Sequence, residues 1–199
     1  MSISIIHGDI WSQPRGVLVH GCNAQGVMGK GAALGFKKKF PAAFAQYRKA
    51  WEEGKLKLGE VIFCELGPDL WGACAITQQH YGRGAVHADL RAIEKAFGKI
   101  AGFAADKGLP VSFIRVGAGL AGGDWNDIQP IIQRALGPRG GVLVEFGAPA
   151  TPSQASEPGA QGDPAAQSAT AQAAAPAGVR PAGAPPVGAG GLRGWGQKR

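Results

Sequence analysis

Two glycine-rich loops follow apolar runs of the chain, and each has residue types that suit the binding of an anion or a sugar. The first loop contains Asn23 together with Gly26, Gly29 and Gly31, and it follows the apolar run at 16–20. Glycine leaves backbone N–H groups uncovered and permits positive φ, so several N–H groups can converge on one ligand atom. A helix expected from about residue 32 adds the positive end of its dipole. The pattern predicts a phosphate or sugar site, although a tight turn that only packs a strand on a helix is the alternative.

The second loop spans residues 117–124 and matches the spacing G-x-G-x-x-G that binds dinucleotides. A Rossmann domain would continue with several further strands, whereas only one apolar run follows here. The first loop is not a P-loop, because Val27 stands where the phosphate-binding lysine is required. Loops at the carboxyl ends of neighbouring strands face one crevice. The two loops therefore predict a shared site for a ligand with a diphosphate and flanking sugars.

Other polar residues are candidates for binding or proton transfer. Asp9 lies in a turn and could accept a hydrogen bond from an exocyclic amine such as that of adenine, or it could simply cap the turn. His80 could move protons near neutral pH, or it could be an ordinary surface histidine. No group of His, Cys, Asp or Glu has the spacing of metal ligands, so neither a metal nor another cofactor is expected.

The elements that position these loops alternate between strands and helices. Continuous apolar runs predict strands at 2–6, 16–20, 61–66, 72–77, 111–116 and 141–146. Helical spacing and flanking Pro and Gly residues predict helices at 32–40, 41–53, 87–107 and 125–136. Strands that are apolar throughout are buried on both faces. The expected fold class is therefore α/β, a three-layer α/β/α sandwich with a mixed central sheet.

Composition divides the chain into a domain at 1–148 and a tail at 149–199. The tail is rich in Ala, Pro and Gly and is expected to be disordered, because it cannot bury enough apolar surface to offset its ordering entropy. The net charge is +7, which suits an anionic ligand without requiring nucleic acid. Three cysteines without a paired framework, no long apolar run and no signal peptide predict a cytoplasmic protein that does not associate with membranes. The protein is also expected to be a monomer.

Taken together, the motifs in residues 1–147 resemble those of the macro domains, which bind ADP-ribose. Asp9 and Ile10 resemble the turn that contacts adenine, Asn23 resembles the asparagine on the distal ribose, and 117–125 resembles the diphosphate loop. The ligand-binding residues that this resemblance implies are Asp9, Ile10, Asn23, Val27, Met28, Gly29, Lys30, Gly31, Thr77, Gly117, Ala118, Gly119, Leu120, Ala121, Gly122, Gly123 and Trp125.

The resemblance is nearest to a branch that includes ADP-ribose 1''-phosphate phosphatases, a terminal ADP-ribose protein glycohydrolase and an antitoxin that removes ADP-ribose from DNA. His20 resembles a histidine implicated in the phosphatase activity, although a core histidine is the alternative. Gln78 and Gln79 replace the catalytic lysine of the glycohydrolases, and Ala121 replaces an aspartate that one of them uses. The leading expectation is a hydrolase of ADP-ribose 1''-phosphate with His20, Asn23 and His80 as catalytic residues. The alternatives are a non-catalytic ADP-ribose reader and an enzyme that removes ADP-ribose from a modified protein or nucleic acid.

Overall fold

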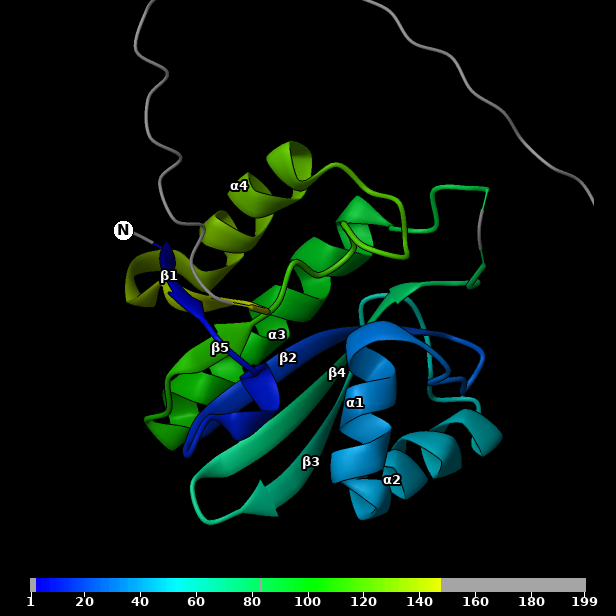
Figure 1. The fold of residues 1–199 in the computed structure, drawn as a ribbon, viewed down its shortest axis with the longest axis horizontal. Helices are drawn as coiled ribbons and strands as arrows, with labels where there is room; N and C mark the ends of the chain where they lie inside the picture. Colours follow the sequence, from blue (N-terminus) through cyan, green and yellow to red (C-terminus); the bar gives the residue numbers. More distant parts are fainter. Residues whose placement is uncertain (1–2, 83, 148–199) are drawn as a thin grey trace, which may run out of the picture. The chain divides into compact units, whose positions relative to one another are not determined.

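A six-stranded mixed sheet forms the centre of the domain (Figure 1). The computed structural model describes residues 3–82 and 84–147, so the expected disordered tail lies outside the described residues. The strand order is β1-β6-β5-β2-β4-β3. All neighbouring strands are parallel except β3 and β4, which pair antiparallel. The strand bounds are β1 (Ile3–His7), β2 (Gly16–Asn23), β3 (Val61–Gly67), β4 (Leu70–Gln78), β5 (Val111–Phe113) and β6 (Gly141–Glu145).

Helices cover both faces of this sheet, as Figure 1 shows. The helices are α1 (Gly31–Lys39), α2 (Pro41–Glu52), α3 (Leu90–Lys107) and α4 (Trp125–Leu136), with short 3-10 helices η1 (Ile10–Ser12) and η2 (Gly137–Arg139). Val17 and Val19 of β2 pack with α3 and α4, whereas the intervening Leu18 packs with the core under α1 and α2. This alternation explains why β2 is apolar at successive positions. The predicted α/β/α sandwich is confirmed.

Local hydrogen bonds set the element ends that face the functional loops. Asp89 accepts a hydrogen bond from the Ala92 N–H at 2.8 Å, so α3 begins at Leu90 rather than at the expected residue 87. β5 ends at Phe113, three residues earlier than expected, and the chain then turns sharply with Val116 N–H donating to Ile114 C=O at 2.6 Å. In the part of the chain that the structure describes, no helix is long and apolar enough to cross a membrane.

Candidate functional site

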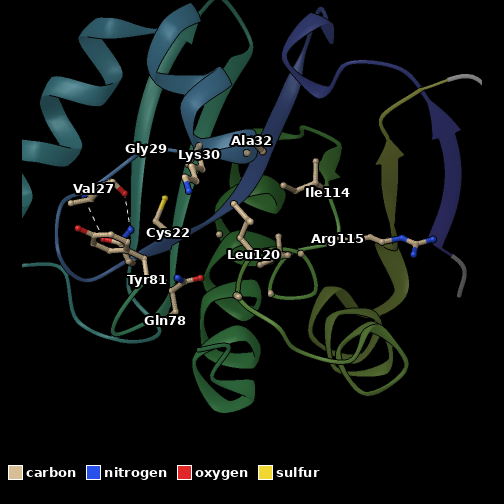
Figure 2. A pocket seen from close by; sticks show the side chains of 18 of the residues that line it. Cys22, Val27, Gly29, Lys30, Ala32, Gln78, Tyr81, Ile114, Arg115 and Leu120 are labelled. Carbon is tan, nitrogen blue, oxygen red and sulfur yellow. Dashed lines mark hydrogen bonds between the residues drawn. The ribbon is translucent and has the colours of Figure 1, made fainter. Parts of the chain in front are cut away.

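A pocket of about 500 Å³ lies between the loops that follow β2, β4 and β5, with the start of α1 on one side (Figure 2). It occurs where the carboxyl ends of parallel strands meet, as expected for α/β sheets. The predicted ligand-binding residues that line it are Asn23, Val27, Gly29, Lys30, Gly31, Gly117, Gly119, Leu120 and Ala121. The two glycine-rich loops, almost ninety residues apart in sequence, therefore form opposite walls of one cavity.

Other lining residues were not assigned to the site from the sequence. They are Gly21, Cys22, Ala32, Ala33, Gln78, Tyr81, Gly82, Ile114, Arg115 and Val116. The segment at 114–116 was expected to belong to a strand, but β5 ends before it and releases it into the pocket wall. Tyr81 and Gly82 lie in the loop that begins at the carboxyl end of β4, which is the sequence signal that could have indicated them.

Asn23 holds the first loop in shape through its side-chain amide. Its Oδ1 accepts from the Gln25 N–H at 3.0 Å and the Val27 N–H at 3.2 Å, while its Nδ2 donates to Val27 C=O at 2.7 Å. The buried Tyr47 hydroxyl donates to Asn23 C=O at 2.7 Å, and burial raises the pKa of Tyr47, which keeps this donor protonated. Because an amide has two N–H donors, the second N–H of Asn23 can donate to a ligand in the pocket.

The start of α1 presents backbone donors to the pocket. The first N–H groups of any helix lack intrahelical acceptors. In α1 these groups belong to Gly31, Ala32 and Ala33, all of which line the pocket. Lys30 occupies the N-cap position and its side chain makes no capping hydrogen bond. The helix end is therefore open to an anionic ligand, which its dipole also favours.

The second loop presents a further group of backbone donors on the opposite wall. Gly117 has φ +81°, and its C=O accepts from the Gly123 N–H at 2.9 Å, which closes the loop into a ring. Among the described residues, no protein acceptor is seen for the N–H groups of Gly119, Leu120 and Ala121. Consecutive N–H groups arranged in this way form an anion-binding concavity. The pocket therefore has backbone donors on two facing walls.

The charged side chains around the pocket favour the same kind of ligand. Lys30 and Arg115 line it, and none of the lining residues in the described chain is an aspartate, glutamate or histidine. Arg115 is held in place by Glu145, whose Oε1 accepts from Arg115 Nε at 2.9 Å. This ion pair neutralises Arg115, and Figure 2 shows its side chain pointing away from the other lining side chains. Lys30 is therefore the lining cation, among the described residues, whose charge suits a phosphate-bearing ligand.

Several predicted binding residues lie outside the pocket lining. Asp9 caps η1, where its carboxylate accepts from the Trp11 N–H at 2.9 Å and from the Ser12 hydroxyl at 3.2 Å. Thr77 is fully buried, and its Oγ1 has no hydrogen-bond partner among the described residues. The others are Ile10, Met28, Ala118, Gly122, Gly123 and Trp125. Their contacts with a ligand, and that of Asp9 with adenine, stay predictions.

The two predicted catalytic histidines occupy different environments. His20 is fully buried, with its ring 4.6 Å from that of Phe36 and 5.2 Å from that of Trp11, and it does not line the pocket. His80 is exposed, and Gln25 Nε2 lies 2.9 Å from its Nδ1. This contact joins the loop after β4 to the first glycine-rich loop beside the pocket. The catalytic role of either histidine stays a prediction.

Comparison with known proteins places the chain in a family. A family model described as Macro domain matches residues 19–132, which is more than half of the chain. The chain belongs to the macro domain family. The resemblance inferred from the two glycine-rich loops is confirmed.

Individual relatives of this macro domain are named for different activities. A 47-residue segment is 55% identical to an ADP-ribose 1''-phosphate phosphatase of Neosartorya fischeri, covering 23% of this chain and 24% of the relative. A 66-residue segment is 38% identical to a DNA ADP-ribosyl glycohydrolase of Thermus aquaticus, covering 33% of this chain and 18% of the relative. The solved macrodomain protein from Streptomyces coelicolor is 30% identical with a TM-score of 0.61, over 74% of this chain and all of that one. The chain matches less than a quarter of the length of these two curated relatives.

Proposed function

We propose that this macro domain binds ADP-ribose in the pocket and hydrolyses ADP-ribose 1''-phosphate to ADP-ribose and inorganic phosphate. The observation that carries the proposal is the pair of backbone donor groups, one at the start of α1 and one at residues 119–121, on opposite walls of one pocket. The relative of Neosartorya fischeri, which is named as a phosphatase of this substrate, supports the choice of reaction.

The ligand groups can be assigned to the walls by their chemistry. The diphosphate binds the N–H groups of the second loop, and the terminal phosphate lies toward the positive end of α1 and Lys30. Asn23 donates its remaining N–H to a hydroxyl of the distal ribose, from a side chain that three hydrogen bonds already hold in position. A donor that needs no reorganisation positions the substrate at little entropic cost.

The lining residues restrict how the phosphate can be removed. By the resemblance, Gln78 and Gln79 stand in place of the lysine of related glycohydrolases, and the nitrogen of an uncharged amide is not nucleophilic enough to attack the ribose. We infer that water attacks the phosphorus atom directly and that the bond between phosphorus and the ribose 1'' oxygen breaks. A non-bridging phosphate oxygen of the substrate takes a proton from the attacking water and passes a proton to the leaving 1'' oxygen, which gives the free hydroxyl of ADP-ribose and inorganic hydrogen phosphate. The backbone donors and Lys30 offset the negative charge of the phosphoryl group.

A second function, binding of ADP-ribose without turnover, is favoured by one observation. None of the lining residues in the described chain is a carboxylate or an imidazole, which are the usual general acids and bases. A reader of ADP-ribosylated macromolecules needs the donors of the pocket but needs no proton-transfer group. The two functions share the binding step and differ only in the release of phosphate.

Calorimetry with ADP-ribose and a phosphate-release assay with ADP-ribose 1''-phosphate separate these functions. We expect Asn23→Ala to weaken ADP-ribose binding by about 10- to 100-fold, because the substitution removes a donor and the hydrogen bonds that shape the loop. Gln79→Ala is the matched control, since Gln79 is exposed, lies directly after β4, the strand that pairs with β2, and does not line the pocket. Absence of binding at millimolar ADP-ribose would refute both functions, and tight binding without phosphate release would establish the reader.

A further inference from the structure

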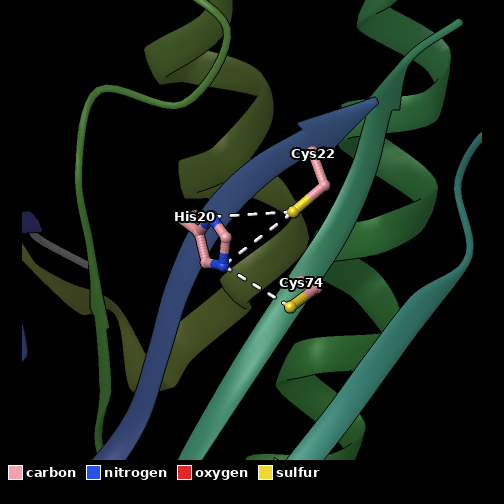
Figure 3. A group of neighbouring side chains, drawn as sticks. All are labelled: His20, Cys22 and Cys74. Atoms are coloured by element: carbon pink, nitrogen blue, oxygen red, sulfur yellow. Dashed lines mark hydrogen bonds between the residues drawn. The ribbon is translucent and has the colours of Figure 1, made fainter. Parts of the chain in front are cut away.

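A cluster of one imidazole and two thiols is buried on β2 and β4 (Figure 3), and one of its members, Cys22, also lines the pocket. His20 and Cys22 are two residues apart on β2, so both side chains point to the face of the sheet that α1 and α2 cover. Cys74 lies opposite His20 in the register of β2 and β4 and points to the same face. The sequence shows no metal-ligand spacing here, because the third member of the cluster comes from a separate strand.

The dimensions of the cluster match those of a metal site. His20 Nε2 lies 3.4 Å from the Cys74 sulfur and 3.8 Å from the Cys22 sulfur. In a tetrahedral zinc site, bonds of about 2.0 Å to nitrogen and about 2.3 Å to sulfur place these two atoms roughly 3.5 Å apart. All three potential ligand atoms lie within 4.8 Å of one another. A metal ion could therefore be bound with only small movements of side chains.

The charge of such a site also suits its surroundings. Phe36 and Trp11 pack against the His20 ring, and all three cluster residues are buried. An uncompensated charge would be costly in this environment. Two thiolates and a neutral imidazole cancel the charge of one divalent ion, and binding displaces one proton from each thiol. The resulting complex has no net charge.

We propose that His20, Cys22 and Cys74 bind a thiophilic divalent metal ion of the zinc type. The ion ties β2 to β4, and one of its ligands, Cys22, also lines the pocket. Three protein ligands leave one coordination position for water or another small ligand. This site is distinct from the proposed ADP-ribose site, because His20 and Cys74 do not line the pocket.

The chain provides its own matched control for this proposal. Cys64 is a third buried cysteine on the same face of the sheet, on β3. Its sulfur contacts Ala43 C=O at 3.6 Å, and it does not belong to the three-residue cluster. The Cys64 thiol interacts with that of Cys74. Cys64→Ala therefore removes the same atom as Cys74→Ala from a buried position beside the cluster, but it removes no proposed ligand.

The test measures metal content of the full-length chain, purified without a histidine tag and reduced before incubation with Zn²⁺. We expect one zinc per chain in the native protein and in Cys64→Ala. Circular dichroism checks that Cys22→Ala and Cys74→Ala fold. Both variants should bind zinc at least ~100-fold more weakly than the native protein, because loss of a residue that only supports a ligand already lowers metal affinity by about 10- to 100-fold. Equal zinc retention by Cys74→Ala, or equal loss by Cys64→Ala, would overturn the assignment.

Cobalt provides a second measurement that needs no variant. Co²⁺ bound by two thiolates gives a sulfur-to-cobalt charge-transfer band together with intense visible bands of tetrahedral cobalt. We expect both in the native chain, with two protons released per ion bound. If both cobalt bands are absent at saturating Co²⁺ and the chain binds less than about 0.1 zinc ion, the proposal of a metal site is refuted, whether or not ADP-ribose binds.

Discussion

Gly117 is a residue of the second loop at which a single methyl group should destabilise the domain. Its backbone has φ +81°, in the left-handed region that favours glycine. A Cβ added there would lie 2.9 Å from Ile93 Cδ1 and 3.1 Å from Ile128 Cδ1. Both isoleucines are fully buried side chains of α3 and α4, so they have little room to move away. The substitution Gly117→Ala therefore combines backbone strain with overpacking.

The cost of Gly117→Ala can be estimated from these two effects. A left-handed conformation costs an L-residue about 1–2 kcal/mol, and inserting a methyl group into a packed core costs about 1–3 kcal/mol. The free energy of unfolding should therefore fall by about 2–5 kcal/mol. For a domain of this size, that corresponds to a melting temperature roughly 5 to 15 °C lower.

Thermal unfolding followed by circular dichroism tests this estimate, with Gly119→Ala as the matched control. Gly119 lies two residues further along the same loop, is not among the positive-φ glycines, and has open space where its Cβ would be. Gly119→Ala should melt within about 2 °C of the native protein. If Gly117→Ala also melts within 2 °C, or if both variants lose stability equally, the packing account of this loop is incorrect.

Three further predictions concern other parts of the domain. His20→Ala should lower the free energy of unfolding by about 3 kcal/mol, because the ring is buried against Phe36. Its ADP-ribose affinity should stay within about tenfold of that of the native protein. A loss of phosphate release of about 100-fold at unchanged stability would instead show that His20 is catalytic. Hydrogen bonds from Lys99 and Lys95 lower the pKa of Glu60 in the folded protein. The stability that this adds is present above the pKa of Glu60 in the unfolded chain and should be lost as pH falls through its pKa in the folded protein. The free energy of unfolding of Glu60→Gln should therefore depend less on pH in the acid range, and an unchanged dependence would contradict this. Borohydride treatment with ADP-ribose should give no covalent adduct at Gln78, as measured by mass spectrometry, and an adduct there would disprove the water-based route.

The elements around the site could be predicted where local patterns alone determine them. β2 was expected at its apolar run because a strand buried on both faces has no polar alternation, and the structure extends it only toward Asn23. α4 has the bounds expected from its periodicity, and Asp124 caps it by accepting from the Asn126 N–H at 2.8 Å. The two glycine-rich loops were also assigned correctly to one pocket, because strand ends in parallel sheets share an edge.

Other features depend on contacts between distant segments, which no local pattern contains. β5 ends at Phe113 because its parallel neighbours β2 and β6 pair with it only up to that residue, and the apolar character of Ile114 gives no sign of this. His20 could be a site residue or a core residue from its sequence alone, and its burial follows from Phe36 and Trp11 packing over it. The approach of Cys74 to His20 depends on the register between β2 and β4. The sequence by itself therefore determined most of the elements, the glycine-rich loops and the family. Strand pairing and helix packing determined the pocket walls and the buried thiol–imidazole cluster. The pocket walls and the cluster form only when segments far apart in the chain are brought together.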